Sequence, residues 1–164
     1  MKILGIQHND YVNYKKPSFI ILFPYCTFKC GPFCQNKSLI NCTALEVSFK
    51  RLYETYQQNS LNQALVLSGL EPFDSFQDLC ELIEYFRNIK KIKDDIVIYT
   101  GYTEEELYEK LKILKHYIGE EACGGIIIKY GRYQEGKDKV LDSLLGVTLA
   151  SDNQYAKELK NANS

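Results

Sequence analysis

The sequence predicts an α/β fold with a mostly parallel sheet. Continuous apolar runs at residues 18–23, 64–68, 95–99 and 126–128 have the length and pattern of strands that are buried on both faces. The segments between these runs show helical periodicity, and the connections are short. Strands that alternate with helices in this way form a parallel sheet with right-handed crossovers.

The size and composition indicate one globular domain. The chain has 164 residues, of which 45% are apolar and 25% charged, and we expect one domain over residues 1–164 with a tail at 157–164 that frays. The formal charge of -1 favours neither a nucleic-acid nor a membrane partner. No run is long enough for a membrane span, and the first residues are too polar and short for a signal peptide, so a cytoplasmic location is expected.

Pairs of capping residues predict where three helices begin. The pairs are Thr43 with Glu46, Asp74 with Gln77, and Thr103 with Glu106. The first helix is expected to run to about Asn59, and Cys80 in the second to pack in the core. Further on, we expect a strand over residues 144–149 and a short helix after residues 151–154.

The unusual stretches of the sequence all follow predicted strands. In a parallel α/β sheet, the loops that leave the carboxyl ends of the strands emerge on one edge. We therefore expect a functional site at that edge. The stretches concerned are residues 26–36, 69–72, 100–102, 131–133 and 151–154.

Three cysteines, Cys26, Cys30 and Cys34, follow the first long strand. In a reducing compartment, clustered cysteines are more often metal ligands or redox groups than disulfides. Three thiolates can hold three irons of a four-iron cluster and leave the fourth iron open to a small molecule. A zinc site is the alternative; it would need a fourth ligand, for which Cys42 is the nearest candidate.

The cysteine loop resembles the signature of radical S-adenosylmethionine (SAM) enzymes, Cys-x3-Cys-x2-Cys with an aromatic residue before the last cysteine. Phe33 takes the place of that aromatic residue. The stretch Ser68-Gly69-Leu70-Glu71-Pro72 is similar to the Gly-Gly-Glu-Pro segment of the family, which binds the methionine amino group. A glycine lets the backbone approach a ligand closely, and a glutamate can hold an ammonium group.

The closer resemblance is to the small activating enzymes of anaerobic ribonucleoside-triphosphate reductase. It covers nearly the whole chain, in order, and rests on residues 10–13, 34–36, 69–73, 99–103, 131–133 and 151–154. Two features depart from the family pattern. The spacing Cys-x3-Cys-x3-Cys is one residue longer than the signature, with Gly31 as the natural insertion, and Lys129 lies where the activases tend to have an acidic residue.

The resemblance implies a partial (open) β/α barrel of the radical SAM type, a [4Fe-4S] cluster on Cys26, Cys30 and Cys34, and SAM as the ligand of the open iron. It implies a SAM site formed by Phe33, Asn36, Ser68, Gly69, Glu71, Pro72, Thr100, Tyr102, Asn153 and Gln154. The implied substrate is a glycine-bearing loop of the large reductase subunit, which would receive a glycyl radical. A low-potential donor such as flavodoxin or ferredoxin would supply electrons.

Two alternatives stay open on the sequence. One is a radical SAM enzyme that acts on another glycyl radical enzyme or on a small molecule. The other is a zinc or redox protein without SAM chemistry.

Overall fold

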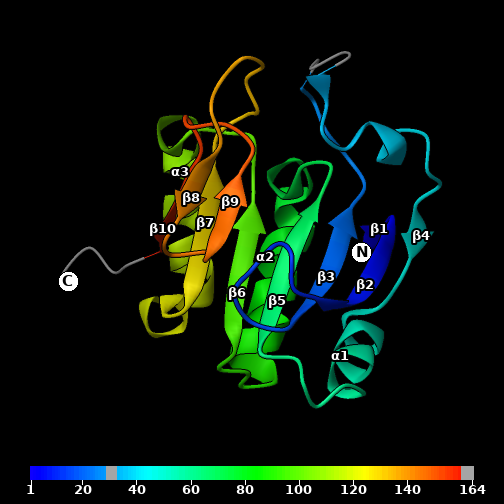
Figure 1. The fold of residues 1–164 in the computed structure, drawn as a ribbon. Helices are drawn as coiled ribbons and strands as arrows, with labels where there is room; N and C mark the ends of the chain where they lie inside the picture. Colours follow the sequence, from blue (N-terminus) through cyan, green and yellow to red (C-terminus); the bar gives the residue numbers. More distant parts are fainter. Residues whose placement is uncertain (29–32, 160–164) are drawn as a thin grey trace.

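The computed structural model describes residues 1–28 and 33–159, and its centre is a six-stranded mixed sheet in the order β10-β7-β6-β5-β3-β2 (Figure 1). The four central strands are parallel, and the two edge strands are antiparallel to their neighbours. The central strands are β3 (Ser18–Phe23), β5 (Ala64–Gly69), β6 (Asp95–Tyr99) and β7 (Ile126–Tyr130), and the edges are β2 (Gly5–Asp10) and β10 (Tyr155–Glu158). All four predicted apolar strands are confirmed, within two residues at their ends.

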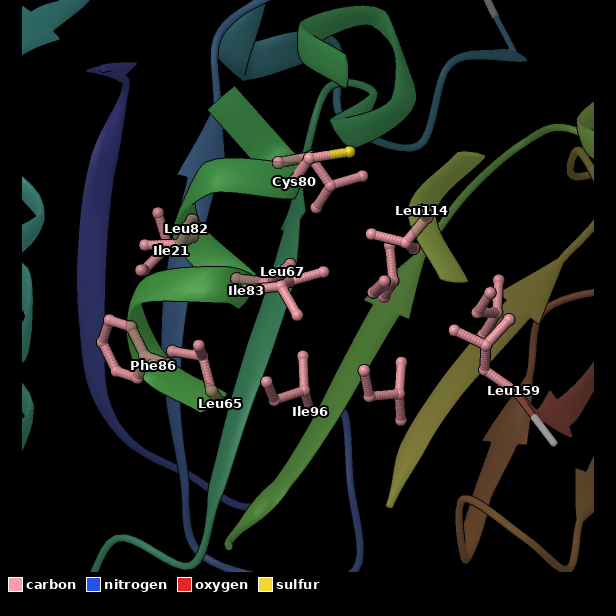
Figure 2. Packing of buried hydrophobic residues seen from close by; sticks show 14 of the residues in the cluster. Ile21, Leu65, Leu67, Cys80, Leu82, Ile83, Phe86, Ile96, Leu114 and Leu159 are labelled. Carbon is pink, nitrogen blue, oxygen red and sulfur yellow. The ribbon is translucent and has the colours of Figure 1, made fainter. Parts of the chain in front are cut away.

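Helices cover one face of the sheet. They are α1 (Phe49–Gln57), α2 (Phe76–Glu84), its π-helical continuation η4 (Tyr85–Ile89), and α3 (Glu104–Ile118). Alternate residues of neighbouring strands lie in register on this face, as in the pairs Ile21 with Leu67 and Leu67 with Ile98. Figure 2 shows the packing of Leu82, Ile83 and Phe86 from the helix over these strands. Cys80 is buried in the same cluster, which confirms its predicted core position.

The opposite face of the sheet is covered without helices. The loop between β2 and β3 and the hairpin of β8 (Val140–Asp142) and β9 (Val147–Leu149) lie in front of the sheet in Figure 1. Tyr14 from the loop and Leu145 from the hairpin pack against the second set of strand residues, including Val66 and Val97. Because both faces are covered, the central strands are apolar at consecutive positions.

The helix start predicted from Thr43 and Glu46 is wrong. Residues Leu45–Glu46 form β4, which pairs with β1 (Lys2–Ile3), and Val47 N–H donates to the carbonyl oxygen of Met1. Residues 45–46 therefore pair with the N-terminal strand and do not form the first turn of a helix. Helix α1 instead begins after Ser48, whose hydroxyl accepts from Arg51 N–H.

The cap predicted from Asp74 and Gln77 is also wrong. A short 3-10 helix, η3 (Pro72–Ser75), precedes α2, and the Glu71 side chain caps it by accepting from Phe73 N–H. Asp74 uses its carboxylate for partners from other loops, and Gln77 donates to Glu81. The third predicted cap is confirmed, because Thr103 and Glu106 form a complete capping box at the start of α3.

The C-terminal part departs from the prediction. The short helix expected after residues 151–154 is wrong for the described residues, because residues 155–158 form β10, which pairs with β7 along its length. The predicted strand over 144–149 begins only at Val147, because residues before it form the hairpin turn, in which Asp142 accepts from Leu144 and Leu145 N–H. Lys157 lies in β10 and Leu159 is buried, whereas residues 160–164 lie outside the described part of the chain.

Two further short helices in the described residues are η2 (Lys37–Leu39) and η5 (Glu120–Cys123). In the part of the chain that the structure describes, none of the helices has the length and apolar character needed to cross a membrane.

Candidate functional site

A cleft of about 330 Å³ opens at the carboxyl edge of the parallel strands, on the face away from the helices. Its wall includes nine of the predicted site residues: Cys26, Phe33, Cys34, Asn36, Ser68, Gly69, Glu71, Thr100 and Gln154. Three others, Pro72, Tyr102 and Asn153, do not line it. Cys30 lies outside the described residues. The topology therefore brings most of the predicted site into one space, as expected for loops at the carboxyl ends of parallel strands.

Two cysteines of the predicted triplet reach this cleft. Cys26 is exposed and Cys34 is half-buried, and both line the wall. Over residues 1–28 and 33–159, no group of three or more His, Cys, Asp or Glu side chains is arranged to hold a metal ion, but this range leaves out the third thiol of the loop, Cys30. Two thiols on one wall and a third two residues beyond Phe28 in the sequence fit a thiolate donor set for iron and sulfide.

The other cysteines stand apart from this wall. Cys42 is exposed, and its thiol contacts the carbonyl oxygen of Ser38. Cys80 and Cys123 are buried, and burial raises the pKa of both thiols. A thiol with a raised pKa is a poor metal ligand because the thiolate is the ligand form. Both belong to the core cluster and neither lines the cleft.

Gly69 has a structural reason to be glycine. Its φ is +96°, and a Cβ there would lie 2.5 Å from the backbone nitrogen of Phe23. The glycine thus lets the end of β5 approach the end of β3 and the start of the cysteine loop. The sequence alone suggested that residue 69 is glycine so that a ligand can approach the backbone. Packing against β3 also explains why this residue is glycine. Asn36 donates to the Gly69 carbonyl oxygen at 2.6 Å, so it ties the far side of the cysteine loop to β5.

Glu71 is the buried carboxylate of the site, with 1% of its surface exposed. One oxygen accepts from Phe73 N–H and from the Thr100 hydroxyl at 2.8 Å, and the other from Gly101 N–H at 2.9 Å. Burial raises the pKa of Glu71 to about 7, although these hydrogen bonds act in the opposite direction. Three donors from the described residues leave room for another hydrogen bond, since a carboxylate has about four acceptor positions.

Lys129 is a site residue that sequence reasoning noticed only as a departure from a family pattern. It ends the run Ile126-Ile127-Ile128, is buried, and lines the same cleft as Glu71. Its ammonium donates to the Gly131 carbonyl oxygen at 2.8 Å and lies over the Tyr99 ring. Burial lowers the pKa of Lys129 to about 8, and the negative charge of Glu71 acts against that shift. The signal available in the sequence was a single lysine at the carboxyl end of an otherwise apolar strand.

Glu71 and Lys129 therefore place opposite charges in one cleft without forming an ion pair with each other. Gln154 adds a neutral contact at the same place, because its amide also donates to the Gly131 carbonyl oxygen, at 3.0 Å. The predicted partner Asn153 instead donates to the Arg132 carbonyl oxygen. The arrangement can receive a ligand with a positive and a negative group.

The loop before β3 forms another part of the cleft wall. In the sequence, its residues 10–13 were noted only as part of the resemblance to the activating enzymes. Val12 and Asn13 line the cleft, and Asn13 is held by Asp10, whose carboxylate accepts from both its backbone and side-chain amides. The Tyr99 hydroxyl donates to the Asn13 carbonyl oxygen at 2.5 Å. Residues of β9 and the turn after it, 147–150, close this side of the cleft.

The comparisons with known proteins concern the cluster. A family model described as a 4Fe-4S single cluster domain matches residues 18–139, which is more than half of the chain and includes Cys26, Cys30 and Cys34. No curated protein and no solved structure matches the chain. The extent of the match supports a 4Fe-4S cluster. The chain belongs to the family of 4Fe-4S single cluster domains.

Proposed function

We propose that this protein is a radical SAM activase, which cleaves SAM reductively at a [4Fe-4S] cluster and generates a glycyl radical on anaerobic ribonucleoside-triphosphate reductase. The observation that carries the proposal is the cleft itself, which brings two cysteines of the triplet together with the oppositely charged Glu71 and Lys129. The family match supplies the cluster, and the partial radical SAM barrel stays a prediction.

The proposed ligands of the cluster are Cys26, Cys30 and Cys34. A reduced cluster, when bound, supplies one electron that breaks a carbon–sulfur bond of the sulfonium, giving methionine and a 5'-deoxyadenosyl radical that takes a hydrogen atom from glycine. What the chain itself supplies is binding, orientation and exclusion of water. Three thiolates leave one iron without a protein thiolate, which is the position where SAM would bind.

The charges of the cleft suit the amino-acid end of SAM. That end carries an ammonium and a carboxylate, and Glu71 and Lys129 carry the complementary charges. Burying each charge without an opposite partner is costly, whereas a zwitterionic ligand would satisfy both. The Lys129 ammonium has three donor positions, and the described contacts use one of them, to Gly131.

The remaining surface of the cleft suits a nucleoside. Phe33 is half exposed and lines the cleft, so its ring is available to an adenine, as the resemblance implies. The cleft volume of about 330 Å³ lies within the range of roughly 300–1,000 Å³ that is usual for small-molecule sites. Gln154 and Thr148 are among the polar residues of a lining that also contains apolar residues such as Leu149.

The rim of the cleft suits a polypeptide substrate. Val12 is 77% exposed and Phe33 is 48% exposed, and both belong to the cleft wall. Exposed apolar side chains beside a binding cleft favour contact with another protein surface. The proposed partner is the glycine-bearing loop of the large reductase subunit, with a low-potential flavodoxin or ferredoxin as electron donor.

The test is anaerobic reconstitution with iron, sulfide, SAM, a reductant and the reductase. We expect about four irons and four sulfides per chain, cleavage of SAM, and a glycyl electron-spin signal on the reductase. Cys30→Ala should abolish all three, while Cys42→Ala, which changes an exposed cysteine away from the cleft wall, should leave them intact.

Two outcomes would overturn the proposal. A colourless protein with one zinc and no iron would contradict the radical chemistry and support a zinc protein. SAM cleavage that proceeds normally but never produces a glycyl signal on the reductase would favour another glycyl radical enzyme or a small molecule as the substrate.

A further inference from the structure

Thr27 and Phe28, which follow Cys26 directly, contact side chains from three segments that are far apart in the sequence. We propose that Asp74, Tyr102 and Arg132 form a clasp that positions the cysteine loop before the cluster is loaded. The three residues follow β5, β6 and β7, respectively. The proposal concerns loading of the 4Fe-4S cluster and does not depend on SAM cleavage.

A triangle of hydrogen bonds forms the polar part of the clasp. The Asp74 carboxylate accepts from Thr27 N–H at 2.6 Å and from the Tyr102 hydroxyl at 2.7 Å. The Tyr102 and Thr27 hydroxyl oxygens lie 3.2 Å apart. Because the Tyr102 hydroxyl has one proton and donates it to Asp74, Thr27 must be the donor to Tyr102. Each of Asp74, Tyr102 and Thr27 is therefore hydrogen-bonded to the other two.

Ring contacts form the apolar part. The Phe28 and Tyr102 rings meet edge to face, with centroids 4.5 Å apart, and the Arg132 guanidinium lies 4.0 Å from the Phe28 centroid. Gly101 makes room for this ring, because a Cβ there would lie 2.6 Å from a Phe28 carbon. The segment after Cys26 is thus seated in a place shaped for it.

Helix α3 holds the clasp at its base. Arg132 forms a two-pronged ion pair with Glu106, with nitrogen–oxygen distances of 3.1 and 3.0 Å. Glu106 is at the same time the capping-box residue that accepts from Thr103 N–H. An arginine held in this way has lost most of its conformational freedom before it meets Phe28.

Backbone groups at and just after the end of β5 contact residues on both sides of the cysteine loop. Asn36 donates to the Gly69 carbonyl oxygen, and Glu71 N–H donates to the carbonyl oxygen of Tyr25. The residues on both sides of the cysteine loop are therefore bound to the sheet edge by contacts between protein groups alone. Holding residues 25–28 and Asn36 in place in advance reduces the entropy that ligand binding must overcome.

Tyr102 takes a different role from the one that the sequence implies. It does not line the cleft, and its hydroxyl is used by Asp74 and Thr27. It is a positioning residue for the cluster loop, acting through Thr27 and Phe28. Substituting it should change how the loop holds iron more than how the cleft holds a small molecule.

The test uses the full chain in two states, with Tyr102→Phe and Asp74→Asn as the variants. In the apoprotein, hydrogen exchange of peptides covering residues 23–28 should be slow in the wild type and faster in both variants, since Thr27 N–H is bound to Asp74. In the loaded protein without SAM, transfer of iron to a chelator should be roughly tenfold faster, equivalent to ~1.4 kcal/mol. In the double variant, the acceleration of iron loss should be smaller than the product of the two single-variant accelerations, because both changes break the same triangle of hydrogen bonds.

The matched control is Tyr108→Phe, which removes a hydroxyl from an exposed tyrosine of α3. Its exchange and iron-loss rates should equal those of the wild type, and the thermal midpoints of all apoproteins should stay close together. Equal exchange of residues 23–28 in wild type, Tyr102→Phe and Asp74→Asn would overturn the clasp. So would unchanged iron loss in both variants, whether or not the protein cleaves SAM.

Discussion

The two edges of the sheet treat buried charge in different ways. At the amino edge, Arg87 donates to three carbonyl oxygens, those of Ile92, Asp94 and Gly124. Burial lowers the pKa of Arg87, and Asp95 and Asp94 act against the shift. Around it, Asp94 accepts from Tyr56, and Asp95 accepts from Tyr14 and pairs with Lys16. The charges at this edge are held by partners that fasten loops together.

At the carboxyl edge, Glu71 and Lys129 are buried beside a cleft without pairing with each other. Their hydrogen bonds hold neighbouring turns, but the opposite charges remain apart. The comparison teaches that burial of a charge alone does not mark a binding site. What distinguishes the carboxyl edge is that its charges line a cleft without pairing with each other, and that the same cleft also carries cysteines.

The largest expected effect tests whether the arginine at the amino edge has a structural role only. Arg87→Met should lower the free energy of unfolding by ~3 kcal/mol, because three carbonyl groups at this edge lose the donor that a buried arginine supplies. Denaturant unfolding of the apoprotein measures the loss. SAM affinity of the folded protein should be unchanged; a loss of affinity equal to that of a cleft variant would contradict the assignment of the two edges.

The next prediction concerns the pH dependence of stability through Glu71. Because burial raises its pKa from an ordinary value of 4.5 to about 7, the folded state binds more protons than the unfolded state between these values. Stability should therefore fall as pH rises from about 4.5 through 7, by up to roughly 3 kcal/mol from this group. Denaturant unfolding of apoprotein across this range measures it, and Glu71→Gln should flatten this component. An unchanged profile in the variant would show that Glu71 is not the group responsible.

The third prediction separates binding from stability at Lys129. Lys129→Met should weaken SAM binding by roughly 10- to 100-fold, since it removes the buried cationic group of the cleft. Unfolding free energy should stay equal or rise, because the Gly131 carbonyl oxygen keeps the Gln154 donor and the cost of a buried ammonium disappears. Calorimetry and denaturant unfolding measure the two effects. Destabilisation with unchanged SAM affinity would make Lys129 a structural residue like Arg87.

The smallest expected effect is the change in iron loss on substitution of Arg132, the clasp residue that contacts Phe28. Arg132→Lys keeps a positive charge near Glu106 but loses the planar group over Phe28. We expect iron loss to a chelator to accelerate by about threefold, less than for Tyr102→Phe, since a cation–π contact of an exposed side chain contributes ~0.5–1 kcal/mol. A larger effect than that of Tyr102→Phe would place the centre of the clasp at Arg132 and not at the hydrogen-bonded triangle.

Much of the fold could be predicted because its signals are continuous. The apolar runs at 18–23 and 126–128 are typical of strands that are buried on both faces, and such strands predict a parallel sheet and the edge where its loops meet. The convergence of Cys26, Glu71 and Gln154 on one cleft follows from that topology. Local capping patterns were less informative, since Thr43 lies beside a segment that pairs with Lys2–Ile3 and Asp74 is used by distant loops.

Other features depend on contacts that no local pattern contains. Residues 155–158 have little strand character of their own, and become β10 by pairing with β7. Lys129 stands out in the sequence only as a departure from a family pattern, and its burial in the cleft that Glu71 also lines depends on the fold. The role of Tyr102 likewise depends on Thr27, which lies 75 residues away in the sequence.

The most direct test of the account is electron-spin resonance of the reduced, iron-loaded protein with and without SAM. If the open iron of a cluster on the cysteine loop faces the cleft, SAM should change the cluster signal in the wild type. Lys129→Met should need a higher SAM concentration for the same change. A reduced cluster whose signal is indifferent to SAM at saturating concentration would contradict the central claim that cluster and ligand share this site.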